Sequence, residues 1–387
     1  MRARRVSDER GIALAVAIFA LVVIGALVAG TFYAARLEQQ TGRNTFEAAQ
    51  VAEAAEAGLK DAIVTRSATG LLAMAINSDL SPTGGTQLSD LTVGGTTTVE
   101  RRVNRLTENV FLVRALAART DASGGQLASR SIGQLIRLMQ ADVEINAGLT
   151  ALGDVTITGG AEVTGIDGVP PTWVDPSLTC PPLGDVTGVS YNDGTLTISG
   201  SGAIGGVPDS ALDATLNKDE MKETFDKLKA LATLIVTNPN PPDMAPAYTA
   251  TVPPRCDTDV ETNWGEPMVP GDPCFDYFPV IYHYGDLKLQ GGRGQGILLV
   301  EGNLTASGGM VFFGPVLVTG TLETTGNSGQ GAKFYGGVIA GNVALDDLSK
   351  LAGGALVSYS SCAIHRALQN SALIGTLAER SWVQLYN

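Results

Sequence analysis

The sequence has little of several residue types on which catalysis or nucleic-acid binding usually depends. It contains two histidines and four cysteines in 387 residues, and 26 Lys and Arg stand against 39 Asp and Glu. The net charge of −13 argues against a nucleic-acid partner, because phosphate binding needs clustered Lys and Arg. No G-x-x-x-x-G-K-[ST] phosphate loop and no G-x-S-x-G nucleophile motif occurs, so neither of these enzyme classes is indicated.

The residues that remain as candidates for chemistry are isolated. His283 lies in the aromatic stretch FDYFPVIYHYGD without a calcium-binding D-x-D-x-D-G loop, so we interpret this stretch as a packed strand. Gly291–Gly296 is glycine-rich but lacks the G-x-G-x-x-G spacing of a dinucleotide site, which favours a turn between strands. Asp346 and Asp347 are paired carboxylates of the kind that cleave glycosidic bonds, yet a single pair is more typical of a solvated turn. We predict no enzyme activity, no metal and no cofactor.

The most informative segment is a long apolar run near the N-terminus. Gly11–Ala35 holds 25 residues without a charged side chain. As a helix this run spans about 37 Å, enough for the roughly 30 Å core of a bilayer. The preceding leader, MRARRVSDER, carries four arginines and should stay cytoplasmic. A cleaved secretory signal is the alternative, but its apolar core runs only about 7–15 residues. We therefore predict a single-pass inner-membrane anchor with the remainder of the chain in the periplasm.

The helical pattern continues beyond the apolar run. Arg36–Arg66 is dense in Ala, Glu, Gln and Leu and free of proline, and these residues are strong helix formers. Phe46, Ala49 and Glu56 recur at near-helical spacing. The segment predicts one continuous helix of about 55 residues, with Gly42 as a place where it is expected to bend.

Three runs with two-residue alternation follow a Gly-, Ser-, Thr- and Pro-rich loop. They are Thr96–Asn104, Asn109–Arg119 and Gln126–Leu138, and turn residues separate them. This pattern predicts an antiparallel meander. Its recurring arginines, among them Arg101 and Arg114, are interpreted as a solvated outer face rather than an anion site.

Beyond Ala147 the chain changes to short apolar strands separated by glycine. LLVEGNLTASGG (Leu298–Gly309) aligns with VLVTGTLETTGN (Val316–Asn327) at an offset of 18 residues, which places Val300 on Val318 and Leu304 on Leu322. A period near 20 predicts a parallel β-solenoid, whose rungs stack their apolar residues and turn their corners at glycine. The strands are too short for an immunoglobulin-like sandwich.

A different composition interrupts this pattern. Ser210–Leu234 predicts a charged helix, and a proline-rich loop over Asn238–Pro279 follows it. Cys256 and Cys274 close part of this loop and are the expected disulfide, with Cys180 and Cys362 as a second bridge. Four cysteines allow three connectivities, so the pairing stays open at this point.

The N-terminal motifs resemble those of a known family. The Arg10-Gly11 junction before the apolar helix, LEQQTGRN (Leu37–Asn44) and AAEAGL (Ala54–Leu59) together resemble the N-terminal region of PilX-type minor pilins of type IV pili and of K-type pseudopilins of type II secretion. The stretch around GVIAGNVAL and GALVSYSSCAIHRAL is similar to β-helical domains attached to PilX-like proteins.

The resemblance implies a processing site and a set of partners. Prepilin peptidase would cut between Gly11 and Ile12, and the helix would pack against other pilin subunits and the assembly machinery. Major pilins carry a glutamate at the fifth mature position, where this chain has Val16. Minor subunits placed at the tip share that absence, so the resemblance implies a tip-located minor pilin in type IV pilus or type II pseudopilus assembly.

The predicted fold class is α+β, with a long membrane-spanning helix, a small antiparallel meander and a parallel β-solenoid carrying a helical and loop insertion. The expected domains are a leader (1–11), the helix (12–66), the meander (71–140), solenoid rungs (147–208), the insertion (209–280), and further rungs with a C-terminal cap that contains Trp382 (281–387).

Other functions remain open for the solenoid. It would serve as a surface-displayed adhesin or carbohydrate-binding module, which is compatible with a tip position. A membrane-bound polysaccharide-degrading enzyme would require a row of exposed Asp, Lys and Arg on one solenoid face. A bactofilin-like polymer would require a cytoplasmic solenoid, which the basic leader opposes.

Overall fold

The fold is taken from a computed structural model of the chain. The structure describes residues 10–94, 96–139, 141, 143–173, 180, 183–192, 194–325, 331–341, 349–351, 354–376 and 382–385. Contacts divide the chain into two units, each described here by itself. The first unit comprises Met1–Arg66, Ala75–Ile136 and Thr376–Asn387, and the second comprises Ser67–Met74 and Arg137–Gly375. Asp346 and Asp347, the paired carboxylates of the sequence, lie outside the described residues.

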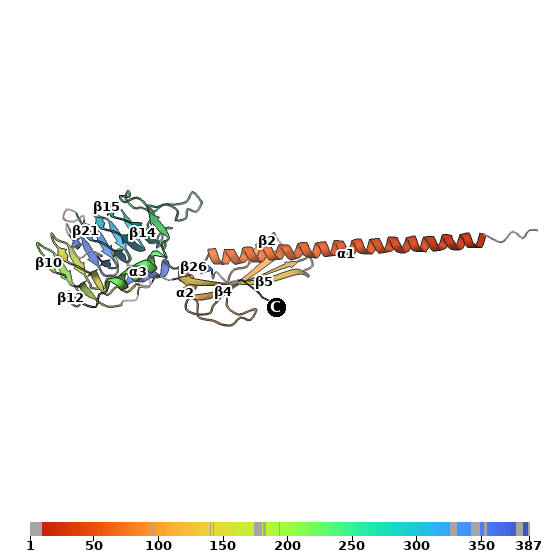
Figure 1. Ribbon diagram of the computed structural model, residues 1–387, viewed down its shortest axis with the longest axis horizontal. Coiled ribbons are helices and arrows are strands. Elements are labelled where there is room, and N and C mark those ends of the chain that lie inside the picture. The colour runs from red at the N-terminus through yellow and green to blue at the C-terminus, as the bar shows by residue number, and fades with distance from the viewer. Residues whose placement is uncertain are drawn as a thin grey trace, which may run out of the picture. The chain divides into compact units, whose positions relative to one another are not determined.

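The first unit is built on one long helix. Helix α1 (Arg10–Val64) has 55 residues and continues through Gly42, where a bend was expected (Figure 1). Its C-terminal half buries Val51, Ala55, Leu59 and Ala62, spaced by three or four residues along one face. Phe46 is 59% exposed and does not belong to this face.

An antiparallel sheet packs against that half of α1. Its long strands are β3 (Thr97–Arg105), β4 (Val110–Thr120) and β5 (Gln126–Met139), and this arrangement confirms the predicted meander. The short strands β1 (Thr86–Gln87) and β2 (Leu91–Val93) both pair with β3. Strand β27 (Trp382–Leu385) pairs with β5, so the expectation that Trp382 caps the solenoid is wrong.

Two arginines of this sheet hold loops and the helix in place. Arg101 forms an ion pair with Asp61 of α1 and donates to the Ser89 carbonyl oxygen, and it is 7% exposed. Arg114 is 8% exposed and donates to the carbonyl oxygens of Leu80, Ser81 and Gly84. Burial lowers the pKa of Arg114. The predicted solvated face is therefore wrong for these two residues, because the loops before β3 fold over them.

The second unit is a three-sided parallel β-solenoid in which each rung gives one strand to each of three sheets. The described residues form six rungs, numbered here in chain order. They are β6 (Ala147–Ala151), β7 (Val155–Ile157), β8 (Glu162–Thr164); β9 (Thr187–Tyr191), β10 (Leu196–Ile198), β11 (Ala203–Gly205); β14 (Val280–Tyr284), β15 (Leu287–Leu289), β16 (Arg293–Gln295); β17 (Ile297–Glu301), β18 (Leu304–Ala306), β19 (Val311–Phe313); β20 (Val316–Val318), β21 (Leu322–Thr324), β22 (Lys333–Tyr335); and β23 (Val338–Ala340), β24 (Ser349–Leu351), β25 (Leu356–Ser358).

The register follows the repeat in the sequence. Val300 of β17 lies beside Val318 of β20, and Leu304 of β18 beside Leu322 of β21, as the 18-residue offset predicts. The inward side chains of these strands form one continuous core that is closed to solvent along most of the stack. Gly308 turns one corner at φ +64°, and an added Cβ there would collide with the backbone of Gln290 on the neighbouring rung.

The rungs do not stack in chain order. The sixth rung pairs with the first through β23–β6, β24–β7 and β25–β8. The spatial order is therefore second, first, sixth, fifth, fourth, third. Strand β12 (Ser210–Leu212) adds to the second rung at one end, and β13 (Leu234–Val236) adds to the third rung at the other.

The chain returns between these two ends through helix α3 (Lys218–Lys229). The predicted helix over Ser210–Leu234 was too long, because its first and last residues form β12 and β13. Asn217 sets the start, since its side-chain oxygen accepts a hydrogen bond from the Asp219 N–H.

Two short helices complete the second unit. Helix α4 (Ser361–Asn370) follows the sixth rung and begins where the Ser360 hydroxyl accepts from the Ala363 N–H. Helix α2 (Ala68–Leu72) precedes the rungs, and strand β26 (Leu373–Thr376) leads the chain back into the first unit.

Arg366 fixes α4 by a cluster of aromatic contacts. Its guanidinium lies 4.6 Å from the ring centre of Trp173, 4.5 Å from that of Phe275 and 5.1 Å from that of Phe278, and it forms an ion pair with Asp276. Burial lowers its pKa. Cation–π contacts of a desolvated guanidinium therefore help to hold α4 to the two loops that supply the rings.

The structure pairs all four cysteines. Cys256 joins Cys274 within the proline-rich loop, and Cys180 joins Cys362 of α4. The two bridges close 18 and 182 residues of chain. The second one ties the loop between the first two rungs to the helix that follows the sixth.

The packing of α1 generates a testable prediction at Gly58. An added Cβ there would lie 2.5 Å from Cγ1 of Val99 on β3, whereas at Gly42 it would meet nothing within 4 Å. We expect Gly58→Ala to loosen the sheet from the helix, raising hydrogen-exchange rates of β3 and β4 amides roughly ten- to hundredfold. Gly42→Ala is the matched control, and it should leave those rates unchanged or lower. Equal effects of the two substitutions would contradict the close approach of α1 to β3.

Candidate functional site: an exposed apolar helix and a groove beneath α3

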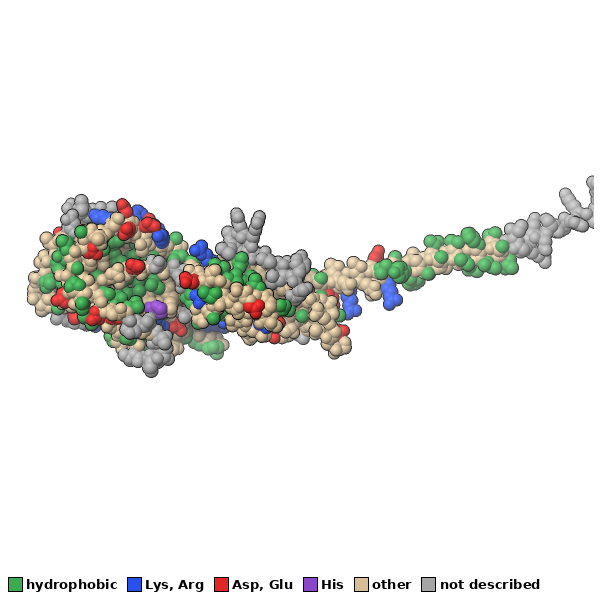
Figure 2. Space-filling view, turned by 90° about the horizontal axis from the view of Figure 1, so that it is seen from below, with side chains coloured by type: hydrophobic (Ala, Val, Ile, Leu, Met, Phe, Trp, Pro, Cys, Tyr) green, Lys and Arg blue, Asp and Glu red, His purple; other side chains and the backbone are tan. Residues whose placement is uncertain are grey.

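The N-terminal half of α1 is an apolar surface with no cover in the described chain. A stretch of 18 residues within it has a mean hydropathy of 2.6, and none of that stretch is buried. Leu14, Phe19, Leu21 and Phe32 are each more than 60% exposed, and Figure 2 shows apolar side chains over the visible surface of this part. A surface of this extent is stable only when lipid or other protein covers it.

The small residues of this half have no role within the chain. Cβ atoms added at Gly25 or Gly30 would meet nothing within 4 Å, in contrast with Gly58. Ala26 and Ala29 lie beside them on the exposed helix. Small residues at such spacing let two apolar helices approach closely. The geometry therefore suits contact with helices of other chains.

An ion pair marks where the exposed half of α1 meets the sheet. Glu47 is 8% exposed and lies 2.7 Å from Arg119 of β4 and 3.9 Å from Arg43. A carboxylate buried to this degree is stable because cations accompany it. From this point onward the helix and sheet of the first unit form one body.

The predicted processing residues lie at the start of the same helix. Gly11 and Ile12 fall in the first turn of α1, after Arg10. Val16 is 60% exposed on the apolar surface. In the described chain, residues 14–46 of the helix, which follow this junction, are exposed.

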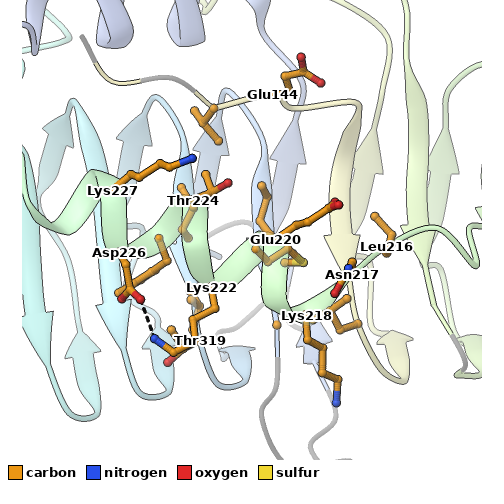
Figure 3. A pocket seen from close by; sticks show the side chains of 18 of the residues that line it. Glu144, Leu216, Asn217, Lys218, Glu220, Lys222, Thr224, Asp226, Lys227 and Thr319 are labelled. Carbon is orange, nitrogen blue, oxygen red and sulfur yellow. Dashed lines mark hydrogen bonds and ion pairs between the residues drawn. The ribbon is translucent and has the colours of Figure 1, made fainter. Parts of the chain in front are cut away.

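The second candidate is a groove of about 690 Å³ in the second unit, between α3 and the outer face of the solenoid. Leu216, Met221 and Phe225 contribute from the α3 side, and Leu152, Leu317 and Ile339 contribute from the solenoid side. Charged side chains of α3, including Glu220 and Lys222, surround the apolar floor, and Figure 3 shows the helix crossing the strands.

A three-residue cluster anchors α3 at the end of this groove. Lys229 Nζ lies 2.5 Å from Glu301 Oε2 on β17, and the Tyr282 hydroxyl donates to the same oxygen at 2.5 Å. The ammonium also lies 4.7 Å from the ring centre of Tyr282. The hydrogen bond from Lys229 and the one from Tyr282 lower the pKa of Glu301, while the bond to Glu301 raises the pKa of Lys229.

The apolar floor of the groove offers a binding surface. Asp213 at its edge accepts hydrogen bonds from the hydroxyl and N–H of Thr215, and these bonds lower its pKa. A carboxylate held in its ionised form by its own loop is a poor general acid. No group of three His, Cys, Asp or Glu side chains suited to a metal ion occurs among the described residues.

The other residues considered from the sequence lie in structural positions. His283 is 2% exposed, with Nδ1 2.8 Å from the Val236 carbonyl oxygen and Nε2 3.1 Å from that of Asp286. Gly292 and Gly296, with φ of +85° and +113°, flank strand β16. The Lys229–Glu301–Tyr282 cluster was missed, because no local motif connects residues 72 positions apart.

Comparison with known proteins gives little additional information. No family model matches the sequence, and no curated protein matches it. Among solved structures, the chain is similar to the competence-associated pilin ComZ from Thermus thermophilus, with 12% identity over 87% of this chain and 97% of that chain. The TM-score is 0.25, so the functional argument rests on the residues described above.

The anchoring of α3 predicts a pH dependence. The pKa of Glu301 is depressed below its ordinary value of 4.5. The contribution of the Glu301 carboxylate to anchoring α3 is therefore complete above about pH 4.5 and is lost as the pH falls through the lowered pKa. Protection factors of α3 amides in hydrogen exchange should therefore fall several-fold in acid, and Glu301→Gln should lower them at neutral pH.

Glu223→Gln is the matched control for this prediction. Glu223 pairs with Lys227 at 2.7 Å, but both side chains are about two-thirds exposed. Exposed pairs of this kind contribute little to stability, because solvent screens them. Protection of α3 that is insensitive to Glu301→Gln, or equally sensitive to Glu223→Gln, would show that the cluster does not anchor the helix.

Proposed function

We propose that the chain is a pilin-like structural subunit, anchored in the inner membrane by residues 12–35 and assembled with other pilin subunits. One observation carries the proposal. A single helix of 55 residues is apolar and uncovered in its first half and fixed to an antiparallel sheet in its second half. A helix divided in this way joins an assembly through one half and carries a folded domain on the other.

The helix suits both storage in a membrane and lateral packing. Its backbone hydrogen bonds are satisfied internally, so lipid and neighbouring apolar helices are alternative covers of similar polarity. Cβ atoms added at Gly25 or Gly30 would contact nothing in the described chain, so these positions allow close approach of a neighbour. The ion pairs of Glu47 with Arg119 and of Asp61 with Arg101 transmit a pull on the helix to the sheet.

We further propose that prepilin peptidase cuts the chain between Gly11 and Ile12, with the leader cytoplasmic and the folded units periplasmic. Four arginines in the first ten residues favour that orientation. The uncharged run begins directly after Arg10, so the cut would leave an apolar N-terminus in the membrane.

Val16 supports a minor, tip-located role in a type IV pilus or a type II pseudopilus. A carboxylate at that position would pair with the terminal amine of a neighbour, and valine has no such group. The chain is then a better initiating subunit than a repeating one. Labelled chain should accordingly appear at fibre ends, and uniform labelling along the fibre would contradict the tip position.

The processing step is tested by sequencing the N-terminus of protein purified from membranes. We expect a chain that begins at Ile12 in cells with prepilin peptidase and at Met1 in cells without it. Gly11→Val should block cutting, because the junction then differs from the one the peptidase recognises. Gly25→Ala, a change of similar kind farther along the helix, should be cut normally.

Two results would overturn the proposal. One is an unprocessed Met1 in the presence of the peptidase. The other is a new N-terminus beyond residue 30, which would identify the apolar run as a secretory signal.

A further inference from the structure

One end of the solenoid is capped by other parts of the chain, and the opposite end is not capped in the described chain. At the end formed by the third rung, the proline-rich loop covers the open strands. The Lys288, Arg293 and Gln295 N–H groups donate to the carbonyl oxygens of Pro239, Met244 and Trp264, and β13 pairs with β14. Met244 and Trp264 close the core there and are 2% and 0% exposed. That end is capped.

The opposite end has no such cover in the described chain. Strands β10, β11 and β12 are each the last strand of their sheets. Figure 1 shows β10 and β12 at the far end of the stack from β14. Ile198 stands in register with the core residue Ile157, and Leu212 with the partly buried Tyr191, yet Ile198 and Leu212 are 49% and 65% exposed. The core of the solenoid is therefore open to solvent at this end.

Two of the three open strands, β10 and β11, carry no charged side chain and no proline. Gly194–Pro208, which contains β10, β11 and their turns, holds no charged residue. Natural edge strands are normally blocked by charged side chains, proline within the strand or a covering loop. Terminal repeats of solenoids are normally polar on their outer face. Two uncharged edges and a third that ends in the exposed Leu212 together indicate a surface that another chain covers.

The shape of the open end selects the partner. Strands β10, β11 and β12 follow one another in the chain on three successive faces, so the end is a rising ramp of three steps. A single extended peptide would pair with one edge and leave two unpaired. A second copy of the same ramp, turned by a two-fold axis through the middle step β11, places its β12 over β10 and its β10 over β12. Each open strand then lies one strand spacing, about 4.8 Å, from a strand of the second copy and pairs with it in antiparallel orientation.

Charge agrees with this axis. Asp209 and Asp213 flank β12, and Asp193 precedes β10 by three positions in the sequence. An axis through β12 would set the carboxylates of Asp209 and Asp213 against those of the second copy. The axis through β11 sets them instead against Ser199 and Thr195, the uncharged residues that directly flank β10.

We propose that two copies of this chain associate end to end through β10, β11 and β12, forming continuous antiparallel sheets across a two-fold axis. Such an interface is isologous and closed, so it gives dimers and not open filaments. The proposal goes beyond the subunit function and does not depend on processing at Gly11, so the two fail independently.

The experiment is sedimentation of the full chain in mild detergent over a range of concentrations. Ile198→Lys places a charge in the core of the proposed interface, while in the single chain that side chain reaches solvent. Ile235→Lys is the matched control, because Ile235 is 61% exposed on β13 at the capped end. We expect wild type and Ile235→Lys to sediment as two chains and Ile198→Lys to show half that mass. A wild-type protein that sediments with the mass of one chain, or equal masses of all three proteins, would overturn the proposal.

A second measurement does not depend on how Ile198→Lys folds. Thr197 and Ala211 lie at the centres of β10 and β12, and all native cysteines are paired. The double variant Thr197→Cys, Ala211→Cys should form a disulfide-linked dimer that reductant dissolves, because the two positions oppose each other across the axis. Each single variant should remain unlinked, since each position opposes a residue without a thiol. Linkage in the single variants, or none in the double variant, would refute the two-fold axis through β11.

Discussion

The parallel pairing of the sixth rung with the first is the contact on which the second unit depends. Strand β23 pairs with β6, β24 with β7 and β25 with β8, so the end of the repeat completes the core begun near residue 147. The first two rungs cannot bury their apolar residues until the last rung has been made. Contacts this distant in sequence make folding slow, because a long loop must close before they form. The Cys180–Cys362 bridge links the same two parts of the chain, because it connects the loop after the first rung to the helix after the sixth. Closing 182 residues, it disfavours the unfolded chain by about 5 kcal/mol on a chain-entropy estimate.

Local pattern predicted the solenoid but not its stacking order. The offset of 18 residues predicted that Val300 would lie beside Val318, because neighbouring repeats in the chain are also neighbours in space. No local signal predicted that β23 would meet β6, since a parallel strand accepts any strand of matching register and polarity. Helix α3 was recognised as an insertion, but its role in carrying the chain from one end of the stack to the other depends on that order. The arginines of the meander were misassigned for a related reason. Arg101 and Arg114 alternate with apolar residues as a solvated face would, yet loops distant in the sequence cover them.

The candidate sites also differ in how far the sequence predicts them. Composition alone predicted the exposed half of α1, because an uncharged apolar run of 25 residues is long enough to cross a bilayer as a helix. The sequence did not predict which face of the other half of α1 is buried. Phe46 is a large apolar residue directly before the buried Glu47 and is nevertheless exposed, whereas Gly58, a poor helix former, is required where β3 approaches. The Lys229–Glu301–Tyr282 cluster needed the structure, because its members come from two separate strands and a helix.

The two exposed apolar surfaces of the chain call for different partners because their backbones differ. In α1 every backbone group in the exposed half is paired within the helix, so any apolar medium is an adequate cover. At β10, β11 and β12 the outward N–H and C=O groups lack strand partners, and lipid would leave them unsatisfied at a cost of several kcal/mol each. Water satisfies those groups but leaves Ile198 and Leu212 exposed. A further layer of strands satisfies both requirements together. The exposed half of α1 is therefore suited to lipid or other helices, and the open end of the solenoid is suited to another β-structure.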